Sequence, residues 1–297
     1  MPAPAPPEAL FSVVCQGEAM QLTPSYGTDP IVTLDGSPAA ILGPAVRQRR
    51  RLAASVAAFD GGQWAHPSRC DGWSARDVIV HLHDTNTFWT YSITAGLKGE
   101  PSQFLAGFDP VASPPQLVAR SHDVSTEDVL DRFLASTESF VGLLASLDEG
   151  DWSALAEAPP GHVSVSAVTH HALWDSWVHE RDILVPLGFT PDEEPDEVAA
   201  CLRYVAALGP AFAKNCGTTD SGLLGITVTQ PDLSFVVEIT DRIAVRAGTT
   251  SADLTLTGDA VELLEALSFR APLEQPIPAE ASWMLRGLSE TFDVEQR

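Results

Sequence analysis

Apolar residues recur every three or four positions through the first two thirds of the chain, and this spacing predicts helices. The first apolar stripe begins at Pro44, a residue favoured at helix starts, and ends at Gly61 and Gly62. Later helices are expected from Ala75 through Ile93, from Thr126 to Leu147, across His170 to Asp182 with an end before Pro186, and from Glu197 to Leu208 with a break at Gly209-Pro210. The sequence therefore predicts a largely helical first domain.

Capping patterns support two of these helix starts. Ser74 with Asp77, and Ser125 with Asp128, have the spacing of a capping box, in which each partner satisfies a backbone N–H of the first turn. The second helix should therefore begin at Ala75.

The hydrophobic period changes beyond residue 217, where short runs alternate apolar and polar residues. The expected strands are Ile226–Thr229, Leu233–Ile239, Arg242–Ala247 and Leu254–Thr257, followed by a helix that Asp259 caps and a short helix near Ser282 to Leu288. We expect an α+β fold with three parts: a flexible Pro-rich tail (1–37), a helical bundle (38–217) and a small α+β C-terminal domain (218–297).

Composition narrows the classes of partner. A formal net charge of -23 over 297 residues disfavours nucleic acid and anionic membrane surfaces, so small molecules or proteins are the expected partners. Neither a signal peptide nor a run of about 18 apolar residues is apparent, which predicts a cytoplasmic protein, monomeric or homodimeric. Cys15, Cys70, Cys201 and Cys216 are scattered, which indicates neither a zinc ribbon nor a disulfide framework.

The stretch Trp174 to Asp182 carries the candidate chemistry. Asp175 and His179 are one helical turn apart, so both side chains lie on one face and can bind one divalent metal. The alternative is a solvated surface pair. Because apolar residues cover several other sides of this helix, its polar stripe is expected to face a cavity.

His81 is the candidate third ligand. It falls on the inward stripe of its helix, between Val78 and Thr85, and a buried histidine needs a partner. That partner is either a metal or a backbone carbonyl. His171, one turn before Asp175, is the rival third ligand.

Three segments, PSRCDGWSARDVIVHLHDT, ALWDSWVHERDILVPLG and ADLTLTGDAVELLEAL, together resemble the mycothiol-dependent maleylpyruvate isomerase-like branch of the DinB superfamily. The resemblance covers about residues 44–288. It implies a DinB-like antiparallel four-helix bundle that holds a metal, usually zinc, followed by a smaller C-terminal domain. His81 and His179 match the histidines of the family motifs, and Asp175 stands where several members have glutamate.

The resemblance also implies a reaction in which a metal-bound thiolate adds to a small electrophilic substrate, which is then isomerised or keeps the thiol. Two neutral imidazoles and one carboxylate leave a zinc site with net charge +1 and an open position, and a metal lowers the pKa of a bound thiol. Because no cysteine lies near a family metal position, the thiol is expected to come from mycothiol. Asp182 is expected to orient a histidine or to cap the turn before Pro186.

Basic residues of the second domain are further candidates. Arg242 and Arg246 could hold carboxylates of the thiol cofactor or the substrate, or could be solvated strand residues. We name Arg246 and Glu180 as candidate catalytic residues; Glu180 or Asp182 would be the base of a thiol-independent hydrolase, the main alternative. A second alternative is a non-catalytic binding or resistance protein whose C-terminal domain holds an apolar ligand.

Overall fold

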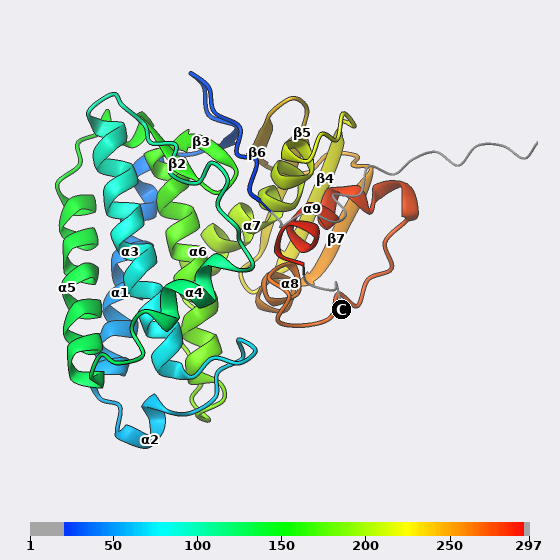
Figure 1. The fold of residues 1–297 in the computed structure, drawn as a ribbon. Coiled ribbons are helices and arrows are strands. Elements are labelled where there is room, and N and C mark those ends of the chain that lie inside the picture. The colour runs from blue at the N-terminus through cyan, green and yellow to red at the C-terminus, as the bar shows by residue number, and fades with distance from the viewer. Residues whose placement is uncertain (1–20, 294–297) are drawn as a thin grey trace, which may run out of the picture.

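The computed structural model describes residues 21–293, which form a helical part and a sheet part side by side (Figure 1). The helices are α1 (Leu42–Ala57), α2 (Gly61–Trp64), α3 (Ala75–Leu97), α4 (Ser113–Ala119), α5 (Thr126–Ala145), α6 (Val165–Leu184), α7 (Pro195–Asn215), α8 (Ala260–Leu267) and α9 (Trp283–Phe292). The strands are β1 (Val32–Leu34), β2 (Leu155–Ala158), β3 (Gly161–Ser164), β4 (Gly222–Thr229), β5 (Leu233–Ile239), β6 (Ile243–Ala247) and β7 (Leu254–Asp259).

The four long helices α1, α3, α5 and α6 form the bundle. The helix pairs α1 and α5, α5 and α3, α3 and α6, and α6 and α1 are all in contact, which closes the bundle. The apolar stripes found in the sequence point inward, with Leu52, Leu82 and Phe133 fully buried between the helices. This arrangement confirms the predicted α+β fold with an N-terminal four-helix bundle.

The sheet has five strands in the order β1-β6-β5-β4-β7. β1 is parallel to β6 and β7 is parallel to β4, while β4, β5 and β6 are antiparallel neighbours. α7 lies between the bundle and the sheet and contacts α6 on one side and β5 and β6 on the other (Figure 1). One hydrophobic cluster joins both parts, so the domain boundary at residue 217 stays a prediction.

Residues 21–37 differ from the loosely docked tail that the sequence predicted. β1 pairs with β6, in the register Val32 to Ile243, and the side chains of Leu22 and Ile31 are buried. Tyr26 donates a hydrogen bond to Glu157 at 2.6 Å. This segment therefore connects the sheet edge to the β2–β3 hairpin; Met1 to residue 20, including Cys15, lies outside the described residues.

α7 also differs from expectation, because it continues through Gly209-Pro210 to Asn215. Proline removes one helical hydrogen bond, but this part of the helix is buried against α9. A Cβ at Gly209 would lie 2.8 Å from the carbonyl oxygen of Met284 in α9. The glycine that suggested a helix end is thus required by the close approach of two helices.

Replacing Gly287 of α9 with alanine tests this close approach. Its Cβ would lie 2.2 Å from the carbonyl oxygen of Gly209 and 2.4 Å from the backbone nitrogen of Ala213, so the helices must separate. We expect Gly287→Ala to lower the free energy of unfolding by about 1–3 kcal/mol in urea denaturation. Gly142→Ala on α5 is the control, because no atom lies within 4 Å of its Cβ and alanine favours a helix.

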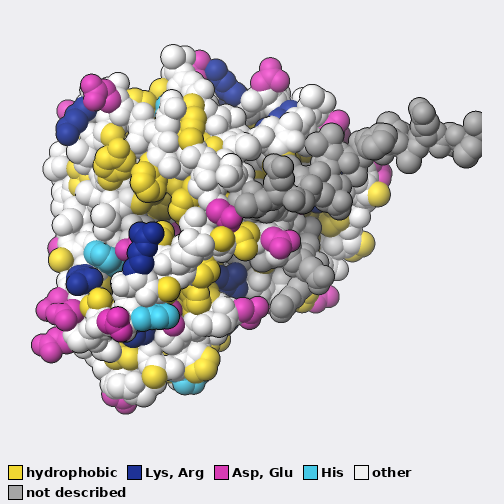
Figure 2. All heavy atoms as spheres, viewed as in Figure 1, with side chains coloured by type: hydrophobic (Ala, Val, Ile, Leu, Met, Phe, Trp, Pro, Cys, Tyr) yellow, Lys and Arg dark blue, Asp and Glu magenta, His cyan; other side chains and the backbone are white. Residues whose placement is uncertain are grey.

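The surface carries the acidic excess of the composition. On the face shown in Figure 2, acidic side chains are spread over the molecule rather than gathered in one patch. None of the helices in residues 21–293 combines the length and apolarity that a membrane crossing requires. The expected absence of nucleic-acid partners stays a prediction.

Candidate metal centre

Two well-capped helices position the three predicted ligands. The Ser74 hydroxyl accepts a hydrogen bond from the Asp77 backbone N–H, and the Asp77 carboxylate accepts one from the Ser74 N–H, so α3 starts where the capping box predicted. Ser164 caps α6 in a similar way through Ala167. The rigid helices α3 and α6 then present His81, and Asp175 with His179, to each other.

The predicted trio meets at one point between α3 and α6. Nε2 of His81 lies 3.9 Å and Nε2 of His179 lies 3.6 Å from Oδ1 of Asp175. One ligand atom from each of the three residues lies within 4.8 Å of the others. Their side chains are only 12–18% exposed, so an ion here would be partly shielded from water. Two imidazoles and one carboxylate form a donor set that fits zinc.

Asp182 fixes the orientation of the His179 ring. Nδ1 of His179 lies 3.0 Å from Oδ2 of Asp182. Because a carboxylate only accepts hydrogen bonds, Nδ1 carries the proton, and Nε2 is left facing Asp175 as the ligand atom. This contact agrees with the orienting role that the sequence predicted for Asp182.

Two arginines from distant parts of the chain hold Asp182. Arg69, in the loop before α3, donates from Nε at 3.0 Å, and Arg270, after α8, donates from Nε at 2.7 Å and Nη2 at 2.8 Å. Glu265 of α8 in turn pairs with Arg69 at 2.8 Å and Arg181 at 2.6 Å. The C-terminal part therefore supports α6, the helix of Asp175 and His179, through Arg270 and Glu265.

The local charges shift the pKa values of these groups in opposite directions. Burial alone would raise the pKa of Asp175, but His81 and His179 hold it well below its ordinary value. Burial also opposes protonation of His179, yet Cys70, Asp182 and Asp175 raise the pKa of this histidine to about 10. In the metal-free protein His179 is therefore cationic at neutral pH, and its imidazolium pairs with the carboxylates of Asp175 and Asp182.

Metal binding should consequently depend on pH. A metal binds the neutral imidazole, so below a pKa of about 10 it must displace one proton from His179. We expect zinc affinity to rise by up to about tenfold per pH unit between pH 6 and 8, measured by competition with a chelator of known affinity. An affinity that does not change over this range would contradict a ligand role for His179.

Cys70 corrects the expectation that no cysteine lies near the metal position. Its Sγ lies 3.2 Å from Oδ2 of Asp182 and 3.7 Å from Nδ1 of His179. Cys70, His179 and Asp182 thus form a second cluster of potential ligands among the described residues. Sequence reasoning missed Cys70, Arg69 and Arg270; the only signal was the position of Arg69-Cys70 just before the His81 helix.

The structure does not bring the other predicted residues to the trio. His171 lies in an aromatic cluster, with Nδ1 3.1 Å from the Tyr204 hydroxyl, and burial lowers the pKa of its imidazole to about 4. Arg242 pairs with Asp29 at 2.7 Å and Arg246 with Glu238 at 3.0 Å, and both arginines are more than half exposed.

Glu180 lies on a different face of α6 from the trio and is not part of the cluster. It is fully buried and accepts hydrogen bonds from Arg51 at 3.0 and 2.7 Å. Burial raises the pKa of its carboxyl, and Arg51 partly offsets this effect. In this position Glu180 links α6 to α1.

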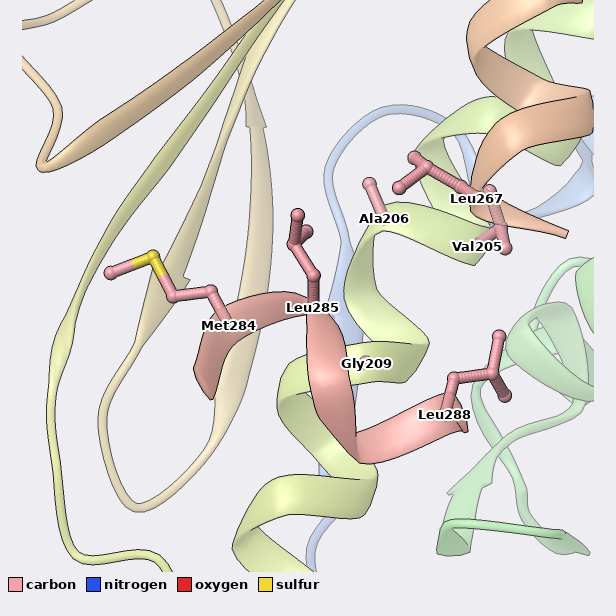
Figure 3. A pocket seen from close by; sticks show the side chains of 7 residues that line it. All are labelled: Val205, Ala206, Gly209, Leu267, Met284, Leu285 and Leu288. Carbon is pink, nitrogen blue, oxygen red and sulfur yellow. The ribbon is translucent and has the colours of Figure 1, made fainter. Parts of the chain in front are cut away.

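An apolar cavity between α7, α8 and α9 tests the alternative that the C-terminal domain holds an apolar ligand. Leu267, Met284, Leu285 and Leu288 line it together with three residues of α7 (Figure 3). Its volume is about 10 Å³, room for about one water molecule. This cavity cannot hold an apolar metabolite without rearrangement of the three helices.

Comparisons with known proteins agree with the fold and with the resemblance found in the sequence. The mycothiol maleylpyruvate isomerase N-terminal domain matches residues 45–184, which include all three predicted ligands. The crystal structure of the mycothiol-dependent maleylpyruvate isomerase is similar at a TM-score of 0.54, with 14% identity, over 80% of this chain and 94% of that chain. A histidine-to-alanine mutant of that enzyme is similar at a TM-score of 0.54, with 13% identity and the same coverage.

No curated protein matches the sequence of this chain. At these identities the solved structures establish the fold, which extends beyond the bundle into the sheet part. The sequence match confirms the resemblance that the motifs indicated: the helical part of this chain, residues 45–184, matches the mycothiol maleylpyruvate isomerase N-terminal domain.

Proposed function

We propose that this chain is a zinc-dependent enzyme that uses a low-molecular-weight thiol, mycothiol, to isomerise a small electrophilic substrate or to transfer the thiol to it. One observation carries the proposal: His81, Asp175 and His179 come from two helices and direct one ligand atom each toward a common point. The match of residues 45–184 to the mycothiol maleylpyruvate isomerase N-terminal domain supports thiol chemistry at this site.

The chain's own residues would hold the metal and set its charge. Two neutral imidazoles and the Asp175 carboxylate leave a bound zinc ion with a net charge of +1, and such an ion stabilises the thiolate form of a coordinated thiol at neutral pH. Asp182 keeps the proton of His179 on Nδ1. Hydrogen bonds from His179 and Arg270 hold the pKa of the Asp182 carboxyl well below its ordinary value despite its burial, so it stays ionised and keeps this role.

An external thiol suits the position of Cys70. Its Sγ contacts Nδ1 of His179, whereas the ligand atom Nε2 is on the other side of the ring. The internal thiol therefore lies behind the metal centre, next to Asp182, rather than at the position that a substrate would approach. This placement favours a thiol that arrives with a cofactor.

The test combines metal analysis with thiol binding. Elemental analysis of purified protein is expected to give one zinc per chain, and calorimetry should show mycothiol binding that disappears when the metal is removed. S-methylated mycothiol is the matched control, because it keeps the sugar portion but cannot form a thiolate. Equal binding of both compounds would contradict thiolate coordination.

Turnover distinguishes the alternatives. Mycothiol-dependent conversion of maleylpyruvate would establish isomerisation, and consumption of the thiol by a fluorogenic electrophile would establish transfer. Hydrolysis of an ester or amide without added thiol would instead favour the hydrolase. The cytoplasmic location and the monomeric or homodimeric state stay predictions.

A further inference from the structure

A second pocket lies on a different face of α6 from the metal trio. It lies between α1, α6 and the loop that follows α6, and its volume of about 300 Å³ is at the lower end of the range for ligand sites. Glu180 and Leu184, which line it, follow Asp175 by five and nine residues, roughly 140° and 180° around the helix. The pocket is therefore separate from the metal centre.

The walls of this pocket are largely apolar. Phe59, just after α1, and Leu184, at the end of α6, contribute one side, and Phe189 and Pro191 contribute the loop side. Phe189 is 48% exposed, which makes it one of the few large exposed apolar side chains in the described chain. Two phenyl rings at one pocket offer faces to a flat apolar group or to a cation.

The floor of the pocket is an ion-pair network around Arg51 that leaves few hydrogen-bond donors for an anion. Arg51 donates to Glu180 at 3.0 and 2.7 Å and to Glu197 at 3.1 and 2.8 Å. These bonds use four of the five N–H groups of a guanidinium. Both carboxylates are fully buried. At the floor, an anionic ligand would therefore meet two buried negative charges and one unused guanidinium N–H.

The rim of the pocket carries one carboxylate that is not paired within residues 21–293, that of Asp192. Asp192 is exposed and, unlike the acids of the floor, makes no ion pair or hydrogen bond in the described part of the chain. The charged residues that line the pocket are two carboxylates, Glu180 and Asp192, and one arginine, Arg51, so its net charge is negative.

We propose that this pocket binds a small organic monocation, a primary ammonium carried on a phenyl or similarly flat apolar group. The ammonium lies against Asp192 at the rim, and the apolar group lies between Phe59 and Phe189. The floor, where Arg51 already has four of its five N–H groups bonded to buried carboxylates, rejects the corresponding carboxylates.

Three probes of similar size test the proposal on the full-length protein: 2-phenylethylammonium, the neutral 2-phenylethanol and the anionic phenylacetate. Binding is followed by NMR shifts of backbone amides. We expect saturable shifts at Glu180, Phe189 and Asp192, with the ammonium bound most tightly and the carboxylate least. Asp192→Asn and Phe189→Ser should each weaken ammonium binding by about two- to fivefold. Glu193→Gln, which removes a neighbouring acid paired with Arg181, should leave it unchanged.

Three outcomes would overturn the proposal. They are equal or tighter binding of phenylacetate, shifts that do not saturate or fall outside the pocket, and equal weakening by Glu193→Gln. Repeating the titration after metal removal separates this site from the proposed enzyme, because the ammonium should bind equally well without zinc. If the protein showed no thiol chemistry, ammonium binding at this pocket would still be expected. If the ammonium did not bind, the proposed thiol chemistry would be unaffected.

Discussion

Replacing His179 with alanine is expected to reduce the zinc content of the purified protein from one ion per chain to a small fraction of that value. The variant loses a ligand whose Nε2 faces Asp175 at 3.6 Å, and two remaining ligands from the trio cannot complete a three-ligand site. His81→Ala should have the same effect, because its Nε2 lies 3.9 Å from the same carboxylate oxygen. Elemental analysis after dialysis against a weak chelator measures both variants.

His83→Ala is the matched control for this loss. His83 follows His81 by two residues on α3, and its nearest charged partner is Asp84 rather than a member of the trio. The His83→Ala variant should keep full zinc content and full mycothiol binding. If His81→Ala and His179→Ala also kept full zinc, the ion would have to be elsewhere, and the cluster of Cys70, His179 and Asp182 could not hold it in the His179 variant either.

The features that the sequence predicted best are local ones. The i, i+4 spacing of Asp175 and His179 determines their shared face in any helix, and the Ser74 cap sets the phase that turns His81 inward. Thr126 begins α5, as the second capping pattern indicated, and Asp259 caps α8 through Val261 and Glu262. Each of these depends on residues within one or two helical turns.

The features that were missed depend on contacts between residues far apart in the chain. Arg270 is 88 residues from Asp182 and Arg69 is 113 residues from it, so no local pattern links them. The pairing of β1 with β6 joins segments about 210 residues apart, and a three-residue strand carries little periodicity of its own. Gly209 was misread for the same reason, because its partner is the backbone of α9.

Replacing Asp182 with asparagine should affect both the stability of the fold and the metal centre. Asp182 is fully buried and accepts hydrogen bonds from Arg69, Arg270 and His179. The amide keeps the shape but removes the counter-charge of Arg270 and one of the two carboxylates that pair with Arg69. Loss of one partner of a buried ion pair costs about 3–5 kcal/mol, and we expect the lower end, because the arginine side chains are 21–23% exposed. Zinc affinity should fall by about 10- to 100-fold as His179 loses its orienting partner.

The pH dependence of unfolding tests whether the stability lost in Asp182→Asn comes from the ionised carboxylate of Asp182. The folded pKa of Asp182 is depressed, so its stabilisation is present above the unfolded value of about 3.9 and is lost as the pH falls below it. The difference in unfolding free energy between wild type and Asp182→Asn should therefore shrink on acidification. Asp131→Asn, at an exposed position on α5, is expected to change stability by less than about 0.5 kcal/mol at every pH. A constant difference for Asp182→Asn would show that the amide disturbs packing instead, and the arginines would then not be anchored by its charge.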